Sequence, residues 1–167
     1  MSLVMMRIDI ISAVPELLVS PLNTSIIKRA QSKELCEVKI HNLRDYTHDK
    51  HKQIDDKPFG GGPGMLLKPE PFFECIEKLQ SERDYNNIIL TSPKGKIFNQ
   101  SYANKLSLGD NIIIIAGHYK GIDERIREKY VTMEISIGDY VLSGGELAAA
   151  VLADSLGRLI PGVLNNE

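Results

Sequence analysis

Short apolar runs alternate with segments of helical periodicity along the chain. Apolar or alternating runs at residues 7–11, 36–40, 88–90, 112–116 and 132–137 are typical of β-strands. Residues 112–116 read Ile-Ile-Ile-Ile-Ala, which is typical of a central parallel strand that helices cover on both faces. The pattern therefore predicts an α/β domain with a mostly parallel sheet flanked by helices.

Helix signals lie between these strands. Pro15 and Pro21 suit the first turns of two short helices, and residues 71–79 have the spacing of an amphipathic helix. Further helix starts are indicated by residue types that cap free backbone N–H groups, namely Asn99, Asp123 and the S-x-x-E capping box of Ser143 and Glu146.

Small residues gather in the turns after three of the predicted strands, at residues 92–93, 117–121 and 138–145. The third turn belongs to the stretch Ser-Ile-Gly-Asp-Tyr-Val-Leu-Ser-Gly-Gly over residues 136–145. Local chemistry leaves that stretch open between a plain strand-to-helix turn and a ligand site. Parallel sheets bind ligands where the carboxyl ends of their strands meet, so three such turns together favour a ligand.

Two familiar phosphate-binding patterns are missing. Residues 59–65, Phe-Gly-Gly-Gly-Pro-Gly-Met, lack the Lys-Ser/Thr pair of a Walker A loop. The sequence also lacks the NAD-binding fingerprint, which is a GxGxxG followed by an acidic residue about 20 positions later. The glycine segment is either a hinge or a place where backbone approaches a base or a phosphate. A nucleoside-containing ligand held mainly by backbone is the favoured hypothesis.

Composition narrows the class of protein. The chain has 167 residues, 43% of them hydrophobic and 25% charged, with a formal net charge of -2, so it is not built as a whole to bind polyanions. Cys36 and Cys75 form no metal or disulfide pattern. The sequence has no membrane-spanning run and no visible signal peptide, so we expect a cytoplasmic protein.

Charged residues of both signs fill residues 41–57. A solvated loop is the plain interpretation. His48, Asp49 and His51 are a weak candidate for a metal site, because their spacing matches no strong motif. The other functional interpretation is a mobile loop that orders on a charged substrate such as RNA.

Four segments resemble a known family. Residues 55–65, 121–125, 136–146 and 160–164 are closely similar to motifs of the bacterial tRNA (guanine-N1)-methyltransferases of the SPOUT class, and the likeness extends over residues 6–163. The resemblance implies an α/β fold with a deep C-terminal trefoil knot, and S-adenosylmethionine as cofactor. It also implies methyl transfer to N1 of guanine 37 of tRNA, and a homodimer whose sites both chains complete.

The resemblance also assigns residues. Residues 1–163 would be the cofactor-binding knotted catalytic domain, and residues 164–167 the start of an interdomain linker. Arg158 would be the catalytic cation, and Asp55 and Gly64 would lie near the target nucleotide. The cofactor would be held by residues at three strand ends, namely Leu90, Thr91, Ser92, Pro93, Gly117, Tyr119, Ser136, Ile137, Gly138, Asp139, Tyr140, Val141, Leu142, Gly144 and Gly145.

Methyl transfer to N1 of guanine needs a general base and a cation. N1 of guanine carries a proton at neutral pH, so a carboxylate must accept it while a guanidinium stabilises the charge that develops on O6. From the residues alone, Arg158 is simply a surface cation near a helix C-terminus.

The sequence departs from the family pattern in two places. The family's general base is an aspartate shortly after residues 160–164, and no residue up to Glu167 matches it. We therefore expect this chain to bind cofactor but to be weakly active or inactive. Lys120 stands where family members often carry glutamate, which puts any role of Mg²⁺ in doubt. The alternatives are a non-catalytic RNA-binding domain without cofactor and, less favoured, a nucleotide-hydrolysing domain.

Overall fold

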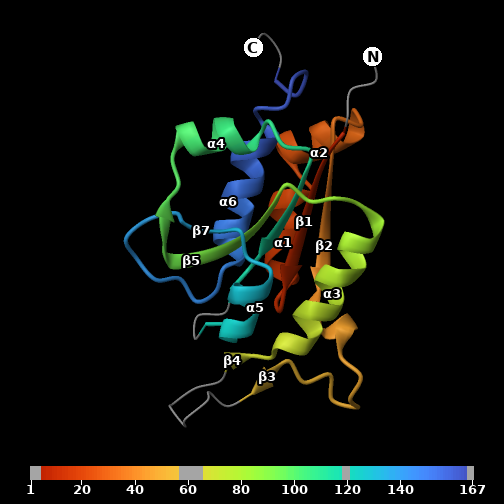
Figure 1. The fold of residues 1–167 in the computed structure, drawn as a ribbon. Coiled ribbons are helices and arrows are strands. Elements are labelled where there is room, and N and C mark those ends of the chain that lie inside the picture. Colours follow the sequence, from red (N-terminus) through yellow and green to blue (C-terminus); the bar gives the residue numbers. More distant parts are fainter. Residues whose placement is uncertain (1–4, 57–65, 118–120, 165–167) are drawn as a thin grey trace.

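A computed structural model describes residues 5–56, 66–117 and 121–164 of the chain. Its centre is a five-stranded sheet in the order β2-β1-β6-β5-β7, in which every neighbouring pair is parallel (Figure 1). The strands are β1 (Met6–Ser12), β2 (Cys36–Asn42), β5 (Asn87–Ile97), β6 (Asn111–Ile115) and β7 (Met133–Ser136). The predicted α/β fold with a parallel sheet is confirmed, and the all-isoleucine run lies in its central strand, β6.

Helices cover both faces of the sheet, and the sheet separates two hydrophobic layers. One layer packs α1 (Glu16–Leu22), α2 (Ser25–Ser32), α4 (Gln100–Leu106) and α6 (Glu146–Gly157) against alternate side chains of the strands. The other packs α3 (Pro69–Glu82), α5 (Glu124–Lys129) and the 3-10 turn η1 (Leu43–Tyr46) against the remaining side chains. Because β-strand side chains alternate between faces, Ile8 and Ile10 enter the first layer and Ile11 the second.

Buried charges lie among the side chains of β1. Asp9 is fully buried, and its carboxylate accepts hydrogen bonds from Arg7 Nη2 at 3.1 Å and Tyr85 Oη at 2.6 Å and contacts His41 Nε2 at 2.7 Å. We call these four residues the Asp9 cluster. Burial by itself would raise the pKa of the Asp9 carboxyl, but the hydrogen bonds from His41, Tyr85 and Arg7 outweigh it and hold the pKa below its usual value.

A two-stranded ribbon lies beside the main sheet. It pairs β3 (Asp55–Asp56) with β4 (Leu66–Leu67) in antiparallel register. Leu67 forms a bridge to Ile122, and Asp123 N–H donates to the Leu67 carbonyl at 3.4 Å. These contacts fix the ribbon next to the start of α5.

Most of the predicted helix starts agree with the structure, and Pro15 directly precedes α1. Asn99 and Asp123 cap α4 and α5, with side-chain oxygens that accept backbone N–H groups. Pro21 was expected to open the second helix, but it lies in the last turn of α1, where the helix ends one residue later. Proline lacks the N–H that would bond the Leu17 carbonyl, four residues earlier, and α1 does not extend beyond Leu22.

A helix begins where the pattern of Ser143 and Glu146 predicts it, but the capping box itself is wrong. α6 begins after Gly145 without a side-chain cap, and Glu146 is 4% exposed and accepts a hydrogen bond from Ser12 instead. The predicted turn at residues 92–93 is a bulge within β5 and does not end the strand. Thr91 and Lys96 both pair with Ile135 of β7, so residues 92–95 bulge out between them.

Candidate functional site

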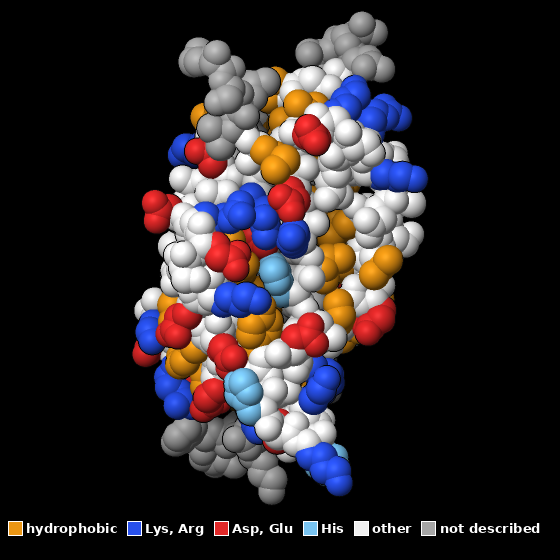
Figure 2. Space-filling view, turned by 90° about the vertical axis from the view of Figure 1, so that its right-hand side faces the viewer, with side chains coloured by type: hydrophobic (Ala, Val, Ile, Leu, Met, Phe, Trp, Pro, Cys, Tyr) orange, Lys and Arg blue, Asp and Glu red, His pale blue; other side chains and the backbone are white. Residues whose placement is uncertain are grey.

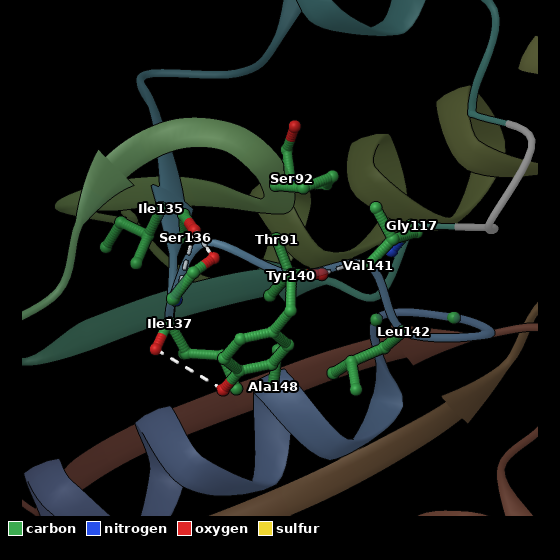
Figure 3. A pocket seen from close by; sticks show the side chains of 14 residues that line it. Thr91, Ser92, Gly117, Ile135, Ser136, Ile137, Tyr140, Val141, Leu142 and Ala148 are labelled. Atoms are coloured by element: carbon green, nitrogen blue, oxygen red, sulfur yellow. Dashed lines mark hydrogen bonds between the residues drawn. The ribbon is translucent and has the colours of Figure 1, made fainter.

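A cleft opens at the carboxyl ends of β5, β6 and β7 (Figure 3). It is narrow, with a volume of about 60 Å³. Its walls are the three strand ends and the first turn of α6, through Thr91, Ser92, Pro93, Gly117, Ile135, Ser136, Ile137, Gly138, Tyr140, Val141, Leu142, Gly144, Gly145 and Ala148. The three small-residue turns therefore do converge, as the sequence predicts.

Close backbone packing at Gly145 builds the floor of the cleft. Gly145 N–H donates to the Gly117 carbonyl at 2.6 Å. A Cβ at position 145 would lie 2.1 Å from Thr91 Oγ1 and 2.5 Å from the Gly117 nitrogen, so a side chain is excluded there. Thr91 Oγ1 in turn donates to the Ile115 carbonyl and accepts Gly117 N–H, each at 3.2 Å. One hydroxyl thus joins the ends of β5 and β6 beneath the glycine.

The turn after β7 is held by its own hydroxyl. Ser136 Oγ donates to the Gly138 carbonyl at 2.8 Å and accepts Gly138 N–H at 3.2 Å. Figure 3 shows the Tyr140 ring lying over Ala148, with its hydroxyl toward the Ile137 carbonyl at 3.4 Å. The ring is half exposed and occupies part of the cleft.

None of the described residues that line the cleft carries a charged side chain. Its polar groups are hydroxyls and backbone N–H and C=O groups, and the rest of the wall is aliphatic. Such a site suits a largely apolar ring system with a few hydrogen-bonding atoms at its edges, and it is poorly suited to a naked phosphate.

A second cavity of about 190 Å³ shares Gly117 and Gly144 with the cleft and lies on their other side. Its walls also include Val14, Leu17 and Glu146. Burial raises the pKa of the Glu146 carboxyl, and the hydrogen bond from Ser12 only partly offsets this effect.

Most of the residues assigned to the cofactor line the cleft. Leu90 lies in the core, where its Cδ1 atom approaches the Gly117 turn from below, and Asp139 is exposed beside the cleft. Tyr119, Gly64 and Lys120 lie outside the described residues. The sequence analysis did not assign Ile135 and Ala148 to the site. Both lie close in sequence to assigned residues, Ser136 and Gly145, and that proximity is the signal that could have identified them.

Arg158 and Asp55 are not brought to the cleft within one chain. Arg158 is exposed at the C-terminal end of α6, about 15 Å along the helix from Ala148 in the cleft wall. Asp55 lies in the β3–β4 ribbon, where its Oδ1 atom is buried and has no hydrogen-bond partner among the described residues.

The charged segment forms a separate polar hollow. His48 Nε2 contacts Glu74 Oε2 at 2.7 Å, and the Asp49 carboxylate accepts Gln53 N–H at 3.1 Å. Within residues 5–56, 66–117 and 121–164, no three histidine, cysteine, aspartate or glutamate side chains are grouped so that they could hold a metal ion. The suggested metal site at residues 48–51 therefore gains no support.

The surface over β2 and α3 has no single sign of charge. Figure 2 shows Lys and Arg side chains mixed with Asp and Glu side chains across this face, in keeping with the net charge of -2. Among the described helices, none is long and apolar enough to cross a membrane.

Comparison with known proteins gives a consistent result. Residues 6–167 match the family described as tRNA (Guanine-1)-methyltransferase TrmD. Proteins named tRNA (guanine-N(1)-)-methyltransferase from Christiangramia forsetii and Bacteroides thetaiotaomicron are 61% and 60% identical over 162 residues, which are 97% of this chain and 72% of each relative.

A solved structure shares the fold. The crystal structure of tRNA (m1G37) methyltransferase from Aquifex aeolicus superposes with a TM-score of 0.89 at 37% sequence identity, covering 98% of this chain and 73% of that one. The family match, the relatives and the shared fold all agree with the motifs around the cleft. The chain belongs to the tRNA (guanine-N1)-methyltransferase family.

Proposed function

We propose that this chain binds S-adenosylmethionine in the cleft and serves methyl transfer to N1 of guanine 37 of tRNA. The observation that carries the proposal is the convergence of three strand-end turns on an uncharged cleft with a glycine floor. Family membership supplies the reaction class. When bound, the cofactor supplies an electrophilic methyl group.

The cleft fits the adenosine part of such a cofactor. Backbone groups of the turn after β7 and of Gly117 would bond the edge of the base and the ribose, while Ile135 and Ala148 would contact the ring faces. The Tyr140 ring forms part of the cleft wall and would lie beside the bound adenosine group. Ser136, bonded twice to Gly138, keeps the rest of the turn in place.

In the reaction, Arg158 would stabilise negative charge on O6 of the guanine, and a carboxylate would accept the N1 proton. Residues 1–163 form the cofactor-binding domain in this proposal, and residues 164–167 begin the linker to a further domain. The family's general base matches no residue of this chain. These 167 residues would therefore bind cofactor with little or no turnover.

A homodimer would bring Arg158 to a cleft. Helices α1 and α6 pack side by side, and large apolar side chains are exposed just before α1 (Val14), on α1 (Leu17) and on α6 (Leu147 and Val151). Such a surface is typical of a protein–protein interface. Because Arg158 is about 15 Å along α6 from its own cleft, it would serve the cleft of the partner subunit.

The trefoil knot is also part of the proposal. Gly145, in the segment after β7, lies against both Thr91 of β5 and Gly117 after β6. α6 then packs against α1, α2 and α4 on one face of the sheet. This course supports a C-terminal segment threaded through a loop of the same chain.

Calorimetric titration with S-adenosylhomocysteine tests cofactor binding. We expect saturable binding, one ligand per chain, and a rise in melting temperature with ligand concentration. A folded protein that neither binds nor is stabilised would contradict the proposal and would favour an RNA-binding domain without cofactor. Methylation of unmodified tRNA tests the expectation of little or no turnover. Turnover at the full rate of an intact relative would show that this chain does contain the general base.

A further inference from the structure

The carboxylate of Glu146 is buried behind the cleft wall, and nothing in the proposed reaction uses it. It belongs to the first residue of α6, directly after Gly144 and Gly145, and is 4% exposed. Its Oε2 atom accepts a hydrogen bond from Ser12 Oγ at 2.7 Å. A buried carboxylate with so few donors is costly, so its position constrains the groups around it.

Ser12 connects this carboxylate to the end of β1. Val14 N–H donates to Ser12 Oγ at 2.9 Å, which directs the hydroxyl proton of Ser12 toward Glu146. The preceding residue, Ile11, accepts a hydrogen bond from Ala116 N–H at 3.0 Å. The end of β1 therefore supports both the first turn of α6 and the turn after β6 that carries Gly117.

Glu146 also packs against the glycine turn itself. A Cβ at position 144 would lie 2.7 Å from Glu146 Oε1, so the carboxylate lies tightly against the backbone there. The next residue, Gly145, bonds to Gly117 across the floor of the cleft. On its other side Glu146 lines the cavity of about 190 Å³, which gives the side chain room to move when the Ser12 hydroxyl is absent.

We propose that Glu146 and Ser12 are positioning residues of the cofactor cleft, which hold the Gly144–Gly145 backbone where it can contact the adenosine group. They act through the glycines and do not touch the cofactor. The inference rests on the proposed cofactor binding, and one of its two tests is independent of any ligand.

The first test compares affinities for S-adenosylhomocysteine by calorimetry, well below the melting temperature of each variant. Ser12→Ala and Glu146→Ala should bind about tenfold or more weakly, because each loses a buried hydrogen bond that fixes the wall. Glu146→Gln keeps the shape and an acceptor oxygen for Ser12, so it should bind within about threefold of the parent. Tyr85→Phe is the control, because it removes a buried hydrogen bond to Asp9 on the other face of the sheet.

The second test measures hydrogen exchange of the Gly145 amide by NMR without ligand. Ser12→Ala and Glu146→Ala should exchange this proton about tenfold faster than the parent, and Tyr85→Phe should not. If Glu146→Ala does not fold, Ser12→Ala decides alone, since it removes only one oxygen atom.

Unchanged affinity and unchanged Gly145 exchange in Ser12→Ala would overturn the inference, as would equal losses in Tyr85→Phe. A parent chain that binds no cofactor, yet shows the expected exchange, would contradict the proposed function while leaving the role of Glu146 in the wall established.

Discussion

Asp9 and Glu146 are both buried carboxylates, yet their surroundings shift the two pKa values in opposite directions. Asp9 has donors from Arg7, Tyr85 and His41, and its pKa is lowered in spite of burial. Glu146 receives one side-chain hydrogen bond, from Ser12, and burial raises its pKa. The difference teaches that the number of donors, and not burial alone, decides whether a buried carboxylate favours its charged form.

The two groups also differ in what they support. The Asp9 cluster joins β1, β2 and the segment between α3 and β5, which carries Tyr85, and it lies away from the cleft. The Ser12–Glu146 pair stands directly behind the cleft wall. We therefore expect changes in the Asp9 cluster to affect stability, and changes near Glu146 to affect ligand binding as well.

The largest effect is expected from Asp9→Ala. This change leaves the buried Arg7 without its main partner, and breaking a buried pair costs about 3–5 kcal/mol. Urea unfolding should show that loss, while the folded fraction binds S-adenosylhomocysteine as the parent does. Glu37→Ala is the control, since that half-exposed partner of Arg7 is worth about 1 kcal/mol or less. If Asp9→Ala weakened the affinity for S-adenosylhomocysteine, the Asp9 cluster would affect ligand binding as the Glu146 region does, and the expected difference between the two regions would be wrong.

Gly145→Ala comes next. Its Cβ would lie 2.5 Å from the Gly117 nitrogen, so backbone has to move, and overpacking of this kind costs about 1–3 kcal/mol. Cofactor binding should fall below detection in calorimetry because the floor of the cleft shifts. Gly109→Ala is the matched control, where the nearest contact would be Asn86 Oδ1 at 3.2 Å, remote from the cleft. Normal binding by Gly145→Ala would show that the cleft tolerates a displaced floor.

Thr91→Val tests the hydroxyl beneath the glycine. The change keeps the shape but removes the bonds to Ile115 and Gly117, which should cost about 1–2 kcal/mol of unfolding free energy and weaken cofactor binding. Thr91→Ser retains the hydroxyl and should bind like the parent. Equal behaviour of the two variants in thermal unfolding and calorimetry would contradict the role given to this oxygen.

The smallest effects are slopes of stability against pH, at most about 1.4 kcal/mol per pH unit for each group. Asp9 has a lowered folded pKa, so its contribution is present above the ordinary value of 3.8 and is lost as pH falls below it. Glu146 has a raised folded pKa, so it destabilises the fold as pH rises above the ordinary value of 4.5.

Urea unfolding at a series of pH values measures both slopes. Asp9→Asn should remove a positive slope below pH 3.8, and Glu146→Gln should remove a negative slope above pH 4.5. Slopes of the same sign would mean that the two carboxylates do not differ in the way their hydrogen bonds indicate.

Local sequence patterns predicted the parts of the site that depend on neighbours along the chain. The apolar strands and the small-residue turns at 92–93, 117–121 and 138–145 converge on one edge because parallel strands end together. The resemblance added the identity of the ligand. It also added Tyr140, whose ring occupies part of the cleft.

Contacts between distant residues could not be predicted in this way. Glu146 fits a capping box by spacing, but its carboxylate bonds to Ser12, 134 positions earlier, and a local motif carries no information on that partner. The sequence predicts Asp9 only as one residue of a buried strand, because two of its three partners, His41 on β2 and Tyr85, lie far along the chain. The distance of Arg158 from the cleft follows from the length of α6 and from its direction in the fold.

The contact between Ser12 and Glu146 has a consequence for biosynthesis. It joins β1 to α6, which lies 134 positions later, so the cleft is complete only after α6 has been synthesised. Nascent chains that end before α6 would expose the apolar sheet face and would have no ligand to stabilise them. Ribosome-stalled chains of increasing length should acquire cofactor binding in one step, once α6 has left the exit tunnel; gradual acquisition would show that earlier elements form the cleft alone.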